Sequence, residues 1–176
     1  MADKDYIKGK KILIVDDEPD ILETLEELLP ACETVRASTY EEAKDLLETQ
    51  PFDMAILDIM GVDGFRLLDI SVKKKVIAVM LTAHALNPEN TLKSYNEGAA
   101  FYVPKDKITD IATYLEDVLE AKEKGKNYWW RWFERFSEYY NKKFGPEWQM
   151  SQKEVWKRFE EQKFTGLKHL YMSGVR

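Results

Sequence analysis

Five short predicted strands, four of them mainly apolar and each followed by a stretch with helical periodicity, restrict the folds open to this 176-residue chain. The predicted strands cover residues 11–15, 33–37, 53–58, 75–82 and 99–103, and the first is rich in branched residues, as buried strands are. The helical stretches begin at Pro19, Ser38, Gly64, Pro88 and Lys107, and Ser38 forms a predicted capping box with Glu41. Strands that alternate with helices predict a doubly wound α/β fold, with a five-stranded parallel sheet covered on both faces.

Polar residues follow each of several predicted strands at the point where the strand ends. Asp16 and Asp17 follow the first strand, Asp58 ends the third, Thr82 ends the fourth, and Lys105 comes just after the fifth. Functional residues of parallel sheets lie at the carboxyl ends of the strands. We therefore expect these carboxylates, the hydroxyl and the ammonium to converge on one edge of the sheet.

Carboxylates clustered at that edge need a cation, because like charges raise each other's pKa. Oxygen ligands at a partly open site suit Mg²⁺. An Mg²⁺ ion beside a nucleophilic carboxylate, with a lysine and a hydroxyl nearby, can neutralise an incoming phosphoryl group. A simpler interpretation is that Asp16 and Asp17 only favour the N-terminus of the helix at Pro19, but it does not explain Asp58 on another strand.

The segments ILIVDDE, AILD, VMLTA and YVPK, each at a strand end, together resemble the response-regulator receiver domain of bacterial two-component signalling over residues 11–121. The resemblance implies a flavodoxin-like receiver in which Asp58 is the phosphoacceptor, while Thr82 and Lys105 contact the phosphoryl group. It also implies an Mg²⁺ site whose protein ligands are Asp16 (mainly through water), Asp17, Asp58 and the backbone carbonyl of Met60.

Thr82 and Tyr102 occupy the positions where this family keeps its switch residues, so the resemblance implies that both respond to phosphorylation. Two local features depart from the family pattern. The loop DIMGVDG, residues 58–64, has no proline and is shorter than the usual loop after the phosphoacceptor, and Lys105 follows Pro104 where the family has the reverse order. Neither departure removes a reacting group.

The charge of the chain changes sign near residue 122. Residues 1–120 hold 13 Lys and Arg against 25 Asp and Glu, whereas residues 121–176 hold 13 against 7. Four of the five tryptophans lie within residues 128–148. We therefore predict a receiver domain at residues 1–122 and an aromatic, basic, helical extension at residues 123–176, for dimerisation or partner docking.

In this extension, aromatic residues recur at helical spacing over residues 126–144, and Ser151 with Glu154 predicts a second helix start. Three uses fit it. The extension could pack on its own receiver or on a second copy in a homodimer, it could dock another signalling protein through residues 126–164, or it could bind a membrane surface or nucleic acid. Interspersed glutamates disfavour the last use, and no membrane span is expected.

The single cysteine, Cys32, excludes an intrachain disulfide, and the N-terminus lacks the apolar segment of a secretory signal, so we expect a cytoplasmic protein. We expect a response regulator that takes its phosphoryl group from a sensor histidine kinase or a phosphotransfer protein and signals through protein–protein interaction. It would not be an enzyme, apart from catalysing its own aspartyl phosphorylation and dephosphorylation. The alternative is a receiver-like scaffold that acts without phosphorylation.

Overall fold

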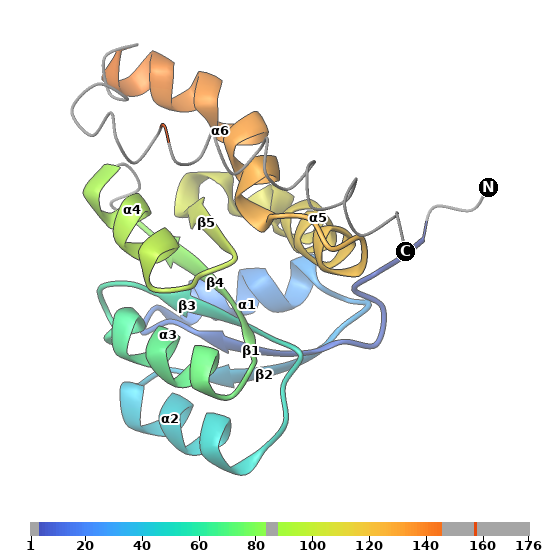
Figure 1. Ribbon diagram of the computed structural model, residues 1–176. Helices are drawn as coiled ribbons and strands as arrows, with labels where there is room; N and C mark the ends of the chain where they lie inside the picture. Colours follow the sequence, from blue (N-terminus) through green and yellow to red (C-terminus); the bar gives the residue numbers. More distant parts are fainter. Residues whose placement is uncertain (1–3, 84–87, 146–156, 158–176) are drawn as a thin grey trace. The chain divides into compact units, whose positions relative to one another are not determined.

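The computed structural model describes residues 4–83, 88–145 and 157. Its sheet has five parallel strands in the order β2-β1-β3-β4-β5 (Figure 1), which confirms the predicted doubly wound α/β fold. The strands are β1 (Lys11–Val15), β2 (Glu33–Ala37), β3 (Met54–Asp58), β4 (Ile77–Thr82) and β5 (Phe101–Pro104). The helices are α1 (Pro19–Leu28), α2 (Tyr40–Thr49), α3 (Gly64–Lys73), α4 (Pro88–Asn96), the 3₁₀ helix η1 (Lys105–Asp110), α5 (Ile111–Glu123) and α6 (Tyr128–Phe144).

The strand order determines which helices share a face of the sheet. The chain runs from β1 outward to β2, returns past β1 to β3, and continues to β4 and β5. With right-handed crossovers, this reversal places α1 on one face and α2, α3 and α4 on the other (Figure 1). Nζ of Lys93 on α4 lies 4.1 Å from the ring centroid of Phe65 on α3, as expected for neighbours on one face. The reversal between β1 and β3 is the position where open α/β sheets bind ligands.

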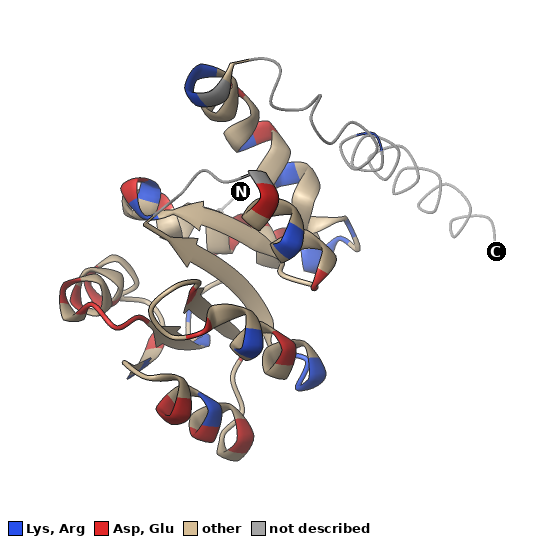
Figure 2. Ribbon diagram, turned by 90° about the vertical axis from the view of Figure 1, so that its left-hand side faces the viewer, with Lys and Arg blue, Asp and Glu red and all other residues tan. Residues whose placement is uncertain are grey.

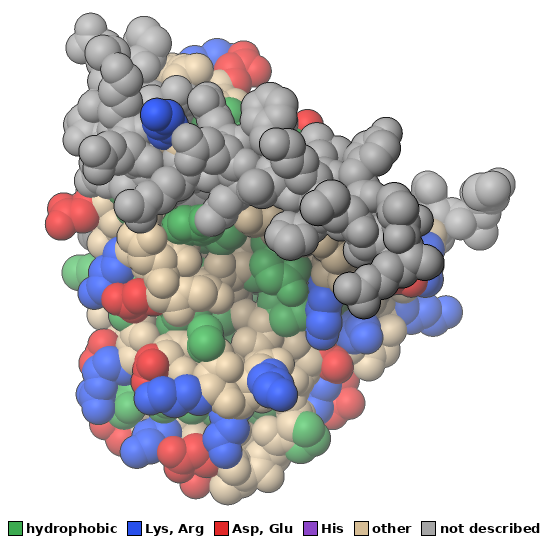
Figure 3. Space-filling model, viewed as in Figure 1, with side chains coloured by type: hydrophobic (Ala, Val, Ile, Leu, Met, Phe, Trp, Pro, Cys, Tyr) green, Lys and Arg blue, Asp and Glu red, His purple; other side chains and the backbone are tan. Residues whose placement is uncertain are grey.

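The central strands form the core of the sheet. All residues of β3 are buried, and Leu13, Ile56 and Val79 from three neighbouring strands have no exposed surface. Burial on both faces explains why these strands read as uninterrupted apolar segments. The outer surface of α2 and α3 shows the opposite composition, with basic and acidic side chains interspersed (Figure 3), which is typical of amphipathic helices whose other side packs on a sheet.

Helix α2 begins one residue later than the predicted capping box implies. The hydroxyl of Thr39 accepts a hydrogen bond from the N–H of Glu42 at 3.2 Å, and the Glu42 carboxylate accepts one from the N–H of Ser38 at 3.0 Å. The capping pair is therefore Thr39 with Glu42, so the prediction of Ser38 with Glu41 was wrong by one position. Both pairs have the spacing of a capping box, and the sequence alone offered both starts.

Strands β4 and β5 both begin two residues later than predicted, because the chain turns at the end of the preceding helix. At the end of α3, the N–H of Lys75 donates to the carbonyl of Val72 at 3.1 Å, and Lys75 has φ 59, a conformation that favours glycine. Because the chain turns here, β4 begins at Ile77 and not at the predicted residue 75. Gly98, with φ 97, ends α4 in the same conformation, and β5 begins at Phe101 and not at residue 99.

The helix predicted at residues 107–121 consists of two elements. The 3₁₀ helix η1 covers Lys105–Asp110, and α5 follows from Ile111 to Glu123. Short 3₁₀ segments are frequent at the N-terminus of an α-helix. Because η1 begins at Lys105 itself, the backbone of this lysine is fixed immediately after β5, where its side chain can reach the carboxyl edge of the sheet.

The chain divides into two compact units between Leu119 and Glu120, within the same helix, α5, that contains the predicted domain boundary. In the second unit, Asn127 caps α6, because its side-chain oxygen accepts a hydrogen bond from the N–H of Trp129 at 2.9 Å. The second helix start, predicted at residues 151–154, lies outside the described residues. Each helix in the described part of the chain is too short or too polar to span a lipid bilayer.

One stripe of α6 consists of aromatic side chains. Its buried members are Trp129, Trp132, Phe136 and Tyr140. The ring centroid of Trp132 lies 5.2 Å from that of Trp129, 5.7 Å from that of Phe136 and 5.3 Å from that of Tyr140. These separations are in the range of favourable aromatic pairs. The amphipathic helix predicted over residues 126–144 is thereby confirmed.

Candidate functional site

Asp16 directly follows β1 and is fully buried. One of its carboxylate oxygens, Oδ1, accepts a hydrogen bond from the N–H of Glu18 at 2.9 Å, and the other, Oδ2, lies 2.8 Å from Nζ of Lys105. Burial raises the pKa of Asp16, while the hydrogen bonds from Lys105 and from the Glu18 backbone act to lower it. A carboxylate buried in this way is stable as an anion only when a cation or hydrogen-bond donors accompany it.

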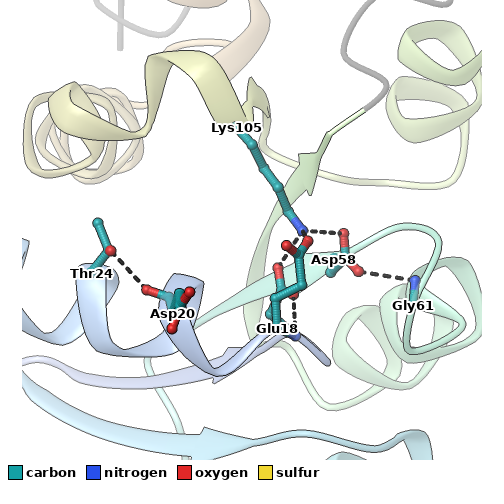
Figure 4. Close-up of polar contacts among 7 residues, drawn as sticks. Glu18, Asp20, Thr24, Asp58, Gly61 and Lys105 are labelled. Atoms are coloured by element: carbon teal, nitrogen blue, oxygen red, sulfur yellow. Dashed lines mark hydrogen bonds and ion pairs between the residues drawn. The ribbon is translucent and has the colours of Figure 1, made fainter.

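Asp58 is the last residue of β3, and its exposed fraction is 3%. Its Oδ1 lies 3.3 Å from Nζ of Lys105, and its Oδ2 accepts a hydrogen bond from the N–H of Gly61 at 2.9 Å (Figure 4). The loop after β3 returns close to the strand end, because a Cβ at Gly64 would overlap the backbone carbonyl oxygen of Asp58. Glycine at position 64 therefore permits the path of the loop that holds the Gly61 amide against Asp58.

Lys105 joins the acidic groups of the two strands. Its Nζ lies 2.8 Å from Oδ2 of Asp16, 2.7 Å from Oε1 of Glu18 and 3.3 Å from Oδ1 of Asp58 (Figure 4). Burial alone would lower the pKa of Lys105, but the hydrogen bonds with Asp16 and Glu18 and the charge of Asp58 outweigh it, so the pKa is raised. An ammonium has three N–H donors, and three carboxylates surround this one.

Three consecutive acids, Asp16, Asp17 and Glu18, form the loop between β1 and α1, where the ribbon is red in Figure 2. One carboxylate oxygen of each lies within 4.8 Å of those of the other two. Asp17 is exposed, and its carboxylate lies against Gly61, because a Cβ at Gly61 would overlap it. The loops after β1 and β3 therefore meet at this side chain.

These residues fit a bound Mg²⁺ ion by the chemistry of their donors. All are oxygen donors, the carboxylates of Asp17 and Glu18 are open to solvent, and the negative charges exceed the single ammonium of Lys105. A hard divalent cation that keeps several waters suits such a site. Asp16, Asp17 and Asp58 would hold it. Met60, a residue with an exposed fraction of 68%, lies in the loop after β3, and its backbone carbonyl as a further ligand stays a prediction.

Thr82 ends β4 and pairs with Pro104, the residue before Lys105. It is fully buried, and among the described residues its Oγ1 has no hydrogen-bond partner. A buried hydroxyl left unpaired costs about 1–3 kcal/mol. An unpaired hydroxyl at the edge that also holds Asp58 and Lys105 is suited to an oxygen atom of a ligand.

Tyr102 lies on β5 opposite Met80 of β4, and it is fully buried. Burial raises the pKa of its hydroxyl, and a hydrogen bond with the side chain of Thr91 acts to lower it. Because Thr91 belongs to α4, Tyr102 connects β5 to that helix. The predicted role of Tyr102 as a switch residue stays a prediction.

The sequence model of a protein family, the response regulator receiver domain, matches residues 12–116 of this chain. The chain belongs to this family. The receiver domain is 35% identical over 103 residues to the two-component response regulator ARR18 of Arabidopsis thaliana, an alignment that covers 55% of this chain and 16% of that protein. It is 30% identical over 124 residues to the response regulator GtcR of Aneurinibacillus migulanus, covering 65% of this chain and 51% of that protein. The chain therefore spans only part of the length of these curated relatives.

Solved structures agree with this membership. A CheY-like response regulator receiver domain protein from Methanospirillum hungatei has a TM-score of 0.60 and 30% identity, and the match covers 67% of this chain and 99% of that one. The non-phosphorylated HemR receiver domain from Leptospira biflexa has a TM-score of 0.56 and 33% identity, with 63% of this chain and 94% of that one covered. Each match covers nearly all of the other chain and about two thirds of this one.

The structure brings Asp16, Asp58 and Lys105 into contact, as the positions of the predicted strand ends imply. Sequence reasoning missed two groups at the same edge. The carboxylate of Glu18 contacts Lys105, and the backbone amide of Gly61 donates to Asp58. The signal for Glu18 was its place directly after the acid pair. No side-chain pattern could indicate the amide of Gly61, because that contact belongs to the backbone.

Proposed function

We propose that this receiver domain accepts a phosphoryl group on Asp58 in an Mg²⁺-dependent reaction. The observation that carries the proposal is the contact between Asp58 Oδ1 and Lys105 Nζ, at 3.3 Å, at a strand end that is also lined by Asp16. A carboxylate oxygen of Asp58 would attack phosphorus, and Lys105 would place positive charge beside the phosphoryl oxygens. The Thr82 hydroxyl would donate a hydrogen bond to one of them. Bound Mg²⁺ would supply further neutralisation of phosphoryl charge.

The proposed donor is a phosphohistidine on a sensor histidine kinase or a phosphotransfer protein. In this transfer a P–O bond to Asp58 forms as the P–N bond to the imidazole breaks. Membership of the receiver family supports this class of donor. The protein would act in the cytoplasm and would catalyse its own aspartyl phosphorylation and dephosphorylation, with no other substrate.

The extension is proposed to pass the signal on by protein–protein contact, in a homodimer or with another signalling protein, through residues 126–164. In the described part of this segment, two cations lie near the ring of Trp130 on α6. Nζ of Lys126 is 5.7 Å and the guanidinium carbon of Arg131 is 5.1 Å from the ring centroid. Tryptophan and arginine are the residues most enriched at the energetic centres of interfaces. This composition supports docking of a protein partner.

The test is the intact mass of the chain after incubation with a small acyl-phosphate donor and Mg²⁺. We expect a single phosphoryl adduct that is absent in Asp58→Asn, because an amide is not a carboxylate nucleophile. Asp63→Asn is the matched control, since Asp63 is an exposed acid of the same loop and pairs with Arg66 instead of Lys105. Its adduct should equal that of the wild type.

An equal adduct on Asp58→Asn would show that another residue is the acceptor. A folded wild-type chain that takes no phosphoryl group from this donor or from a phosphohistidine protein would contradict the proposal and favour the receiver-like scaffold that acts without phosphorylation.

A further inference from the structure

Glu18 contacts Lys105 from an exposed position. Its Oε1 lies 2.7 Å from Nζ of Lys105, while 57% of its side chain is exposed. In Figure 4 the Glu18 side chain lies beside the ammonium, between the two elements that carry these residues. The two residues are 87 positions apart in the sequence, so the contact depends on the fold and not on local chain geometry.

Hydrogen bonds fix the backbone of Glu18, whereas its side chain makes no hydrogen bond to the N-terminus of α1. Its N–H donates to Asp16 at 2.9 Å, and its carbonyl accepts from the N–H of Ile21 at 3.1 Å. At this N-cap position a side chain often accepts a hydrogen bond from the helix backbone, but the Glu18 side chain makes no such bond. The contact with Lys105 therefore takes the place of capping.

The three partners of Lys105 differ in how readily each can leave. The side chain of Asp16 has no exposure and that of Asp58 has 4%, whereas that of Glu18 has 57%. Moving either aspartate away from the ammonium would leave a buried charge uncompensated, which is costly. The Glu18 carboxylate can rotate into water with little loss, because exposed ion pairs contribute little net stability.

We propose that Glu18 is a positioning residue that occupies one donor of Lys105 before phosphorylation and is displaced into solvent when a phosphoryl oxygen takes that donor. This inference rests on the proposed phosphorylation of Asp58. It makes Glu18 a competitor of the phosphoryl group for Lys105. The unmodified site keeps its lysine aimed at the acceptor, and the modified site exchanges one carboxylate for the phosphoryl oxygen.

The experiment is a titration with beryllofluoride, a non-covalent phosphoryl mimic, followed by ¹⁹F NMR of the bound fluoride with Mg²⁺ saturating for each variant. In Glu18→Gln the half-saturating concentration should fall about two- to fivefold, as expected from losing one solvent-accessible ion pair. Glu18→Asp keeps the charge on a side chain that is one methylene shorter, too short for the same contact. Its half-saturating beryllofluoride concentration should also fall.

Asp20→Asn is the matched control for long-range charge. Asp20 is the second residue of α1, where its backbone carbonyl accepts a hydrogen bond from the Thr24 hydroxyl at 2.7 Å, away from Lys105 (Figure 4). Its beryllofluoride titration should match that of the wild type.

A second readout uses the metal-free protein. There the Lys105 ammonium signal in ¹H–¹⁵N NMR should broaden in Glu18→Gln, because the N–H that Glu18 occupied becomes open to exchange with water.

The outcomes separate this inference from the proposed function. If the wild type binds beryllofluoride but the Glu18 variants titrate as the wild type does, the displacement of Glu18 is wrong and phosphorylation of Asp58 stands. If Asp20→Asn tightens binding as much as Glu18→Gln while Glu18→Asp does not, general repulsion explains the effect and the inference is overturned. If the wild type neither binds beryllofluoride nor forms an adduct, both proposals fail.

Discussion

The carboxyl edge of the sheet buries charged side chains, whereas helix α6 buries aromatic ones, and the two kinds of burial have different requirements. At the edge, Asp16 and Asp58 are buried carboxylates, and their contacts converge on Lys105. On α6, Trp132 is buried in contact with other aromatic rings of the same helix. Burial of apolar rings needs no particular partner, whereas a buried charge needs one in a fixed place. The stability of the edge should therefore respond to cations, and that of α6 should not.

The largest effect is expected from Lys105→Met in the metal-free protein. Removing the ammonium leaves Asp16 and Asp58 without a cation, and the free energy of unfolding should fall by about 3–5 kcal/mol. Added Mg²⁺ should restore part of this loss, because a cation again faces the carboxylates. Denaturant unfolding with and without Mg²⁺ measures both quantities. Lys44→Met, at an exposed lysine, is the control and should change little. A loss that Mg²⁺ cannot recover would remove the distinction between the two regions.

Trp132→Leu tests the other side of the comparison. The smaller side chain keeps the stripe apolar but leaves a cavity among the rings, and the unfolding free energy of the second unit should fall by about 2–3 kcal/mol. Because no charge is involved, the loss should be equal with and without Mg²⁺. Glu134→Ala, which removes an exposed partner of Arg131, should cost well under this amount. Fluorescence of the tryptophans of the extension follows the unfolding of the second unit during denaturation. A loss of stability that depends clearly on Mg²⁺ would contradict this prediction.

Asp17→Asn should have the smallest effect on stability and the opposite sign. Without metal, one fewer carboxylate repels Asp16 and Glu18, so the unfolding free energy should rise by about 0.5–1 kcal/mol. Mg²⁺ affinity, measured by calorimetric titration, should fall by about tenfold or more because a ligand is lost. An unchanged affinity would exclude Asp17 as a ligand. An unchanged stability would show that solvent already screens this exposed carboxylate.

The sequence predicted the architecture well because buried parallel strands are uninterrupted apolar segments that end at polar residues. The end of β3 at Asp58 and that of β4 at Thr82 were visible for this reason, and parallel pairing then brings such ends to one edge. The start of β4 was not visible, because Lys75 adopts φ 59 where a glycine would have marked the turn. Helix starts were ambiguous where two capping boxes overlap.

The candidate site was predicted to the level of which residues meet, and not to the level of which atoms pair. Strand ends place Asp16, Asp58 and Lys105 at one edge of the sheet, where their side chains can reach one another. The direction of the Glu18 side chain depends on competition between the N-terminus of α1 and an ammonium far away in the sequence, which no local pattern records. The use of the extension depends on a partner, and composition indicates only the kind of surface that α6 offers.

Gly64 carries no reactive group, yet a Cβ at this position would overlap the backbone of the proposed phosphoacceptor. If every position of the chain were randomised and the products were selected for signalling, position 64 should tolerate replacement as poorly as position 58. Its intolerance would come from space and not from chemistry. The path of this short loop therefore depends on the missing side chain at position 64 as much as the proposed reaction depends on the carboxylate at position 58.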